Sequence, residues 1–185
     1  MLSVGAHMSS HRHLEPILDR CMAREMIDVV QRACEAWGAR EYEIFRDLYT
    51  PDVTASGGAL WMESGSSAQG VEVVIRNFEA IISMFERNEV IPEGVIEAGD
   101  TLVVPLMWRG LPVGSTSFIE QRLFGIFKFR DGQIESMTWF TALEEALEAV
   151  GLGPSAAEDM IVLERPTPAR DTSDQGPADA APGGG

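Results

Sequence analysis

The order of the predicted elements indicates an α+β fold, with helices packed on one face of an antiparallel sheet. Two helical patterns come first, a bent strand and a third helix follow, and four strands and a short helix complete the folded part. Helices gathered early and strands gathered late are typical of this class. Residues 123–152 are the most explicit stretch and predict strand, tight turn, strand and helix. Asp131 and Gly132 mark the turn, since a primed hairpin turn needs positive φ at both central positions.

Three helices are predicted before most of the sheet. Residues 16–38 carry apolar side chains at helical spacing, beginning with a proline that suits the first helical position. Residues 42–49 indicate a second, short helix, which Pro51 stops because a proline disfavours helical geometry in the residue before it. Residues 71–85 have the clearest helical periodicity of the chain. Each pattern supplies one apolar face that can cover a sheet.

The strands follow in order. Residues 53–62 predict a bent strand or a small hairpin, broken at Gly57 and Gly58. Four further strands are expected in antiparallel order, with a loop at 109–114, and they cover residues 90–97, 102–108, 115–128 and 134–140. Residues 143–150 then form a short amphipathic helix that ends at Gly151.

The chain divides into one domain with two flanking segments. Residues 1–15 are expected to form a disordered arm, residues 16–152 the domain, and residues 153–185 a disordered tail rich in proline, alanine, glycine and acidic residues. Residues 160–163 are the only apolar cluster of the tail. They can dock as an extra strand or on a partner, although the composition around them favours an unstructured segment.

The charge of the chain excludes some partners. Its 14 basic and 29 acidic side chains leave a formal net charge of -15, which repels nucleic acids and anionic membrane surfaces. No apolar run is long enough to span a membrane, and the first residues lack the features of a signal peptide. We therefore expect no nucleic-acid partner, no membrane association and a cytoplasmic location.

Histidines and cysteines limit the chemistry. The three histidines all precede Leu14, so histidine triads and histidine-bound metals are not expected in the folded body. Cys21 and Cys34 are separated by about 20 Å along one predicted helix, beyond the reach of a disulfide, and both are expected to be reduced. We predict neither a metal nor a cofactor.

Five short motifs, in this order, make residues 21–152 resemble the nuclear transport factor 2-like superfamily, in particular its SnoaL-like branch. The motifs are YTPDV at 49–53, GVEVVI at 70–75, EAGDTLVV at 97–104, FKFRDGQI at 127–134 and EEALEAVGL at 144–152. The resemblance implies a cone-shaped fold, in which a curved antiparallel sheet wraps around the helices and encloses an apolar cavity. It also implies a homodimer formed through the outer face of the sheet.

The catalytic groups of well-known members can be matched to positions in this chain. The base, tyrosine and oxyanion aspartate of ketosteroid isomerase fall at Gly57, Ala33 and Gly125, and the acidic and basic groups of limonene epoxide hydrolase fall at Leu106, Trp108 and Trp139. Scytalone dehydratase relies on histidines that the body lacks. The resemblance therefore carries the fold but none of these three activities.

Strand alternation proposes which side chains face the cavity. The predicted ligand-binding residues are almost all apolar and include three indoles: Val53, Trp61, Val104, Leu106, Trp108, Leu123, Met137 and Trp139. Such a set suits a cavity for a small hydrophobic molecule. It equally suits a filled core, and the sequence leaves both interpretations open.

Two polar residues share the predicted inner face and are the weak candidates for catalysis. Gln121 could orient a carbonyl group by hydrogen bonding or be solvated at the rim. Glu135 could be a base whose pKa is raised by burial, or a surface residue at the strand end. Glu120 and Arg122 fall on the opposite face, where they would be surface charges or pair across a dimer.

Three functions are compatible with these observations. The leading hypothesis is a SnoaL-like protein that binds a small hydrophobic ligand without demonstrated chemistry. The second is a cofactor-independent enzyme of the polyketide cyclase, isomerase or hydrolase type. The third is a protein-interaction module that uses residues 160–163 or the outer sheet face.

Overall fold

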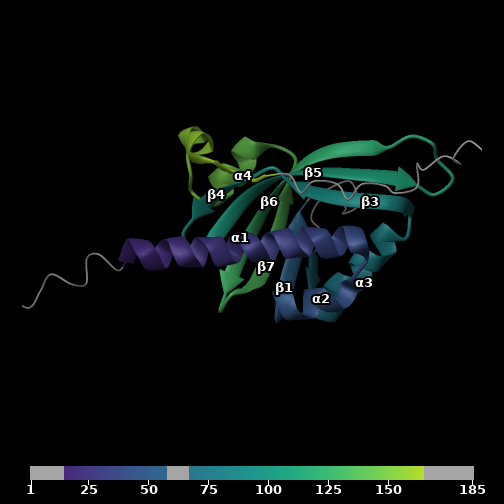
Figure 1. Ribbon diagram of the computed structural model, residues 1–185, viewed down its shortest axis with the longest axis horizontal. Coiled ribbons are helices and arrows are strands. Elements are labelled where there is room, and N and C mark those ends of the chain that lie inside the picture. Colours follow the sequence, from purple (N-terminus) through teal and green to yellow (C-terminus); the bar gives the residue numbers. More distant parts are fainter. Residues whose placement is uncertain (1–14, 58–66, 165–185) are drawn as a thin grey trace, which may run out of the picture.

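The computed structural model describes residues 15–57 and 67–164, with side chains from Met22 onward. Three helices lie in the first half of the chain, α1 (Glu15–Ala39), α2 (Tyr42–Leu48) and α3 (Val71–Ile82), and a short helix, α4 (Leu143–Ala149), follows the sheet. The predicted α+β class is confirmed, and Figure 1 shows α1 lying across a curved, unclosed sheet. No helix in these described ranges is long and apolar enough to cross a membrane.

The sheet has the order β2-β1-β7-β6-β5-β4-β8, and β3 pairs with β5 beside this path. Its strands are β1 (Tyr49–Gly57), β2 (Ser67–Gln69), β3 (Phe85–Pro92), β4 (Gly94–Ala98), β5 (Thr101–Pro112), β6 (Ile119–Arg130), β7 (Gln133–Phe140) and β8 (Ile161–Val162). Every pairing is antiparallel except that of β1 with β7, which is parallel. The antiparallel prediction therefore holds for all of the sheet but this one pair.

Several predicted boundaries are wrong. The third helix ends at Ile82, and Phe85 already begins β3. The single strand predicted over residues 90–97 is divided at Glu93, whose backbone N–H donates to the carbonyl of Pro105 at 2.9 Å. As a result β3 covers one half of β5 and β4 covers the other half. The long β5 also absorbs most of the predicted loop at 109–114.

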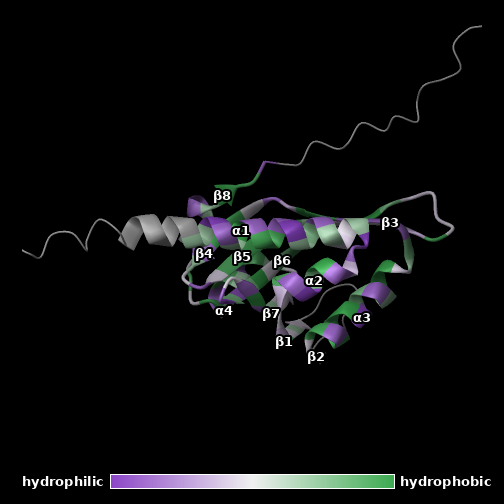
Figure 2. Cartoon of the chain, turned by 60° about the horizontal axis from the view of Figure 1, so that its bottom comes forward, coloured by the Kyte–Doolittle hydropathy of each residue, from purple (hydrophilic) through white to green (hydrophobic). Residues whose placement is uncertain are grey.

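The sheet is covered on both faces over part of its length. The main core lies between the sheet and the first three helices, where Val30, Phe45 and Ile82 are almost fully buried. Helix α4 covers the opposite face, where Ala146 and Leu147 pack beside strand residues of a second cluster. Helices α1 and α3 carry both hydrophobic and hydrophilic residues (Figure 2), as expected of helices with one buried face.

The chain beyond the predicted domain continues as ordered structure. A 3₁₀ helix, η2 (Pro154–Asp159), precedes β8, and β8 pairs with β4 through Gly94↔Val162 and Val95↔Ile161. The backbone N–H of Leu163 donates to the carbonyl of Glu93 at 3.2 Å. The prediction of disorder from residue 153 is thus wrong for residues 154–162. The apolar cluster instead docks as an extra strand on the edge of β4.

Candidate ligand-binding site

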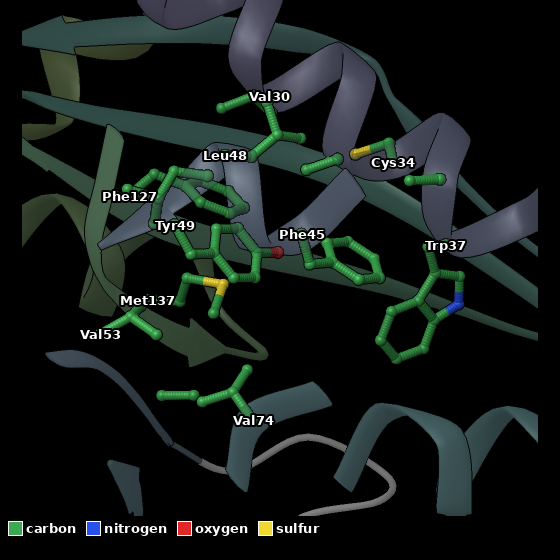
Figure 3. Close-up of a cluster of buried hydrophobic side chains, with 14 of the residues drawn as sticks. Val30, Cys34, Trp37, Phe45, Leu48, Tyr49, Val53, Val74, Phe127 and Met137 are labelled. Carbon is green, nitrogen blue, oxygen red and sulfur yellow. The ribbon is translucent and has the colours of Figure 1, made fainter. Parts of the chain in front are cut away.

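A cavity lies between α1 and the concave face of the sheet. The cavity has a volume of about 30 Å³, enough for about two water molecules. Apolar and aromatic side chains from α1, α3 and four strands line it: Ala33, Cys34, Trp37, Tyr49, Phe78, Val90, Leu123, Phe127, Met137 and Trp139. Figure 3 shows Cys34 and Trp37 projecting from α1, with Tyr49, Phe127 and Met137 grouped below the helix.

The cavity is small because an indole occupies part of the inner face. A Cβ atom added to Gly125 would lie 2.6 Å from Cε2 of Phe127 and 3.0 Å from Cζ3 of Trp139. These two rings pack edge to face with centroids 5.5 Å apart. The position matched to an oxyanion aspartate therefore has no room for a side chain, since this chain's own aromatic rings already fill it.

Gly57 is closed to a catalytic side chain for a different reason. Its φ is 108°, a conformation that residues with a Cβ rarely adopt. An added Cβ would lie 2.3 Å from the backbone carbonyl oxygen of Trp139. A carboxylate base at this point would require the β1–β7 pairing to open.

Of the predicted lining residues that the structure describes, three line the cavity and four do not. Leu123, Met137 and Trp139 line the cavity. Val53, Val104 and Leu106 are fully buried in the main core and fill space. Trp108 is buried next to the cavity, in a cluster with Leu123. Trp61 lies outside the described residues.

The predicted lining omitted the helical residues of the cavity, although the family comparison had matched Ala33 to a catalytic tyrosine position. Ala33 and Trp37 lie four residues apart on α1, and Phe78 comes from α3. Their signal was present in the apolar stripes of both helices, but a stripe indicates only burial and not which members border empty space. Tyr49 was expected in the second helix and instead begins β1.

Glu135 does not face the cavity. Lys128 pairs with Ser136 and Phe129 pairs with Ile134, so Glu135 is the extra residue of a β-bulge. Its carboxylate lies 2.9 Å from Nη1 of Arg130 and 3.5 Å from Nζ of Lys128. This weak candidate for catalysis is therefore a partly exposed ion-pair member. Its predicted inner-face position is wrong, because the bulge reverses the alternation from which that position was inferred.

Gln121 keeps its predicted inner-face position. Together with Trp108 and Asn88 it forms a polar layer beside the cavity. It lies opposite Trp108 in the β5–β6 register. The indole N–H of Trp108 donates to Oδ1 of Asn88 at 2.7 Å. Asn88 Nδ2 and Gln121 Oε1 are both buried and have no hydrogen-bond partner among the described residues. The sequence interpretation had not singled out Asn88.

The two titratable groups in the lining remain uncharged at neutral pH. Burial raises the pKa of the Cys34 thiol to about 12, with a smaller contribution from the nearby Glu35 charge. Burial also raises the pKa of Tyr49, well above the ordinary value of a phenol. Neither group can therefore accept a proton as a base near pH 7.

The outer charges form ion pairs within the chain. Arg109 Nε lies 2.7 Å from a carboxylate oxygen of Glu120, and Arg122 pairs with Glu93 at 2.6 Å. Asp52 pairs with Arg130. These pairs are exposed, where such interactions contribute little stability.

Comparison with known families gives one match. The model of the SnoaL-like domain family matches residues 30–137, more than half of the chain. A search of curated proteins found no relative.

Several solved structures share the fold. A protein from Jannaschia, described as a candidate SnoaL-like polyketide cyclase, is 24% identical with a TM-score of 0.54, over 71% of this chain and 94% of that one. A hypothetical protein from Catenulispora acidiphila with a ketosteroid isomerase-like fold, solved with trimethylamine, is 20% identical with a TM-score of 0.55, over 67% and 92%. IdmH from Streptomyces antibioticus, also described as a candidate polyketide cyclase, is 17% identical with a TM-score of 0.54, over 69% and 99%. At these identities the likeness concerns the fold alone.

Proposed function

The chain belongs to the family of SnoaL-like domains, and from this premise we propose that it binds a small, flat, apolar molecule in the cavity beneath α1. The observation that carries the proposal is the lining. Half of its residues are aromatic, and none is charged at neutral pH: Trp37, Tyr49, Phe78, Phe127 and Trp139 are the aromatic members. Aromatic walls favour flat ligands, because rings stack or pack edge to face on them.

A ligand larger than two water molecules fits only if one of the lining side chains moves. Trp139 is the side chain that can do so. Val90 and Trp139 are the only lining residues that remain partly exposed, so the cavity comes closest to solvent beside them. Rotation of the indole away from Gly125 would add the volume of its rings to the cavity. The ligand would then take the place of the indole against Phe127, keeping an aromatic contact there.

Polyketide cyclisation is the second candidate function, favoured by the descriptions of the Jannaschia and Streptomyces proteins. It requires a group that moves a proton at the cavity. Among the described residues Glu135 points into an ion-pair network, and Cys34 and Tyr49 hold their protons. Binding without acid–base chemistry is therefore the better-supported function.

Equilibrium dialysis of naphthalene tests the binding function. We expect Ala33→Leu, which places a larger side chain in the cavity, to weaken binding roughly tenfold or more, a change of about 1.4 kcal/mol. Ala39→Leu is the matched control, since Ala39 is exposed at the end of the same helix. Equal binding by the Ala33→Leu protein and the unmodified protein would place naphthalene elsewhere, and absence of binding would refute the function.

Native mass spectrometry of the purified protein supplies a second test. Retention of a small uncharged molecule from the host cell is expected, and the same spectrum reports whether the protein is the homodimer that we propose from the family resemblance.

A further inference from the structure

We propose that Asn88 is the hydrogen-bond donor that anchors the ligand, and that the ligand carries an uncharged carbonyl oxygen at one end of a flat apolar body. This inference deepens the binding function proposed above and depends on it. It assigns a polar end to a cavity that is otherwise apolar.

The orientation of the Asn88 amide is determined by its partner. The indole N–H of Trp108 can only donate a hydrogen bond. The Asn88 atom that lies 2.7 Å from it must therefore be the oxygen. The NH₂ group consequently points away from Trp108, so the usual uncertainty over amide flips does not arise at this residue.

The Asn88 NH₂ group has no partner within the described part of the chain, although only 5% of the residue is exposed. A buried donor without an acceptor is costly, and the cost is recovered when an acceptor arrives. Ordered water can also satisfy such a group. A ligand carbonyl would displace that water and bring its own apolar surface into the cavity.

The polar layer lies next to residues that line the cavity. Asn88 lies two residues before Val90 on β3, and Gln121 lies two residues before Leu123 on β6, so each shares the inner face with a lining residue. Trp108, on β5, pairs with Val90 of β3 on one side and with Gln121 of β6 on the other. Its ring belongs to the same packed cluster as Val90, Leu123 and Trp139.

The charge of the layer selects the ligand class. Asn88, Trp108 and Gln121 are all neutral, so nothing in this layer compensates a carboxylate or an ammonium group. The amide of Gln121 offers a buried acceptor oxygen, which suits a hydroxyl on the same ligand. A ketone or a hydroxyketone on a fused-ring body fits these requirements.

Affinities for 1-tetralone and tetralin, measured by equilibrium dialysis, test the proposal. The two probes share a fused bicyclic skeleton, and only the first has a carbonyl. We expect the unmodified protein to prefer 1-tetralone by about tenfold, the worth of one recovered buried hydrogen bond. Asn88→Ala should reduce this preference to about twofold or less, whereas the control Asn77→Ala, on the exposed face of α3, should retain it.

A second measurement does not depend on the folding of any variant. In the ¹⁵N-labelled unmodified protein, the side-chain amide resonance of Asn88 should shift downfield with 1-tetralone and stay in place with tetralin. Equal affinities for the two probes with an unmoved Asn88 resonance would overturn the anchor and leave the binding function standing. Failure of both probes to bind would overturn the binding function itself.

Discussion

Replacement of Gly125 by alanine tests whether aromatic rings close the inner face. The added Cβ would lie 2.6 Å from the Phe127 ring and 3.0 Å from the Trp139 ring, both closer than such atoms approach in folded proteins. One or both rings must therefore shift. The backbone of Gly125 itself imposes no penalty, since its φ lies outside the left-handed region.

The magnitude follows from the cost of overpacking a core. Extra methyl groups in a well-packed site cost about 1–3 kcal/mol of unfolding free energy. For a chain of this size that corresponds to a fall in Tm of roughly 2–12 °C. Gly153→Ala is the matched control, because an added Cβ there meets nothing within 4 Å and φ is -86°. We expect that control to stay within about 0.5 kcal/mol of the unmodified protein.

A double-mutant cycle, in which the stability of each variant is measured by urea unfolding, reports the energetic coupling between positions 125 and 139. With Trp139→Leu in place, Phe127 gains room to move aside, so the cost of Gly125→Ala should fall by at least about 0.5 kcal/mol. Additive effects of the two substitutions would refute the account of how this face is filled. A Gly125→Ala protein as stable as the unmodified one would refute it more directly.

Two other features lead to predictions. Gly94→Ala places a Cβ 2.7 Å from Sδ of Met160, so the amide hydrogen of Leu163 should exchange roughly tenfold faster; unchanged exchange would show that the docked tail tolerates the methyl group. In a Cys21→Ser background, Cys34 at pH 8 should react with a disulfide reagent roughly a hundredfold more slowly than in urea. Its pKa is raised from 9.0 to about 12, so its contribution to stability is complete below pH 9 and is lost as pH rises toward 12. Equal reaction rates in buffer and urea would contradict the burial of this thiol.

The fold was readable from the sequence because its signals are local. The Asp131-Gly132 turn and the apolar spacing of residues 71–82 are set by neighbouring residues, and the structure confirms both elements. The end of α3 was misplaced because Phe85 fits the helical spacing, yet it pairs with Pro112 on β5. Pairing with a distant strand overrides local periodicity.

The candidate site was only partly predictable. Leu123, Met137 and Trp139, which alternation placed on the inner face, do line the cavity, because β6 and the end of β7 keep their register. It failed at Glu135, because a bulge has no reliable sequence signal. The size of the cavity was also out of reach, since it depends on where the Trp139 ring rests relative to Gly125.

The docking of the tail illustrates a different limit. A two-residue strand has almost no pattern of its own, and Ile161 and Val162 remain 44% and 73% exposed even when paired. The fit depends on Gly94, which leaves space for Met160. That complementarity joins residues far apart in sequence, so composition alone favoured disorder.

The binding of a flat apolar molecule beneath α1 is tested most directly by methionine-methyl NMR during a naphthalene titration. Met137 lines the cavity and is 1% exposed, whereas Met84 is 53% exposed on the surface. We predict a saturable upfield shift of the Met137 methyl resonance from the ring current of the bound molecule, with Met84 unchanged. A Met137 resonance that stays in place, or moves no more than that of Met84, would contradict the proposed cavity function.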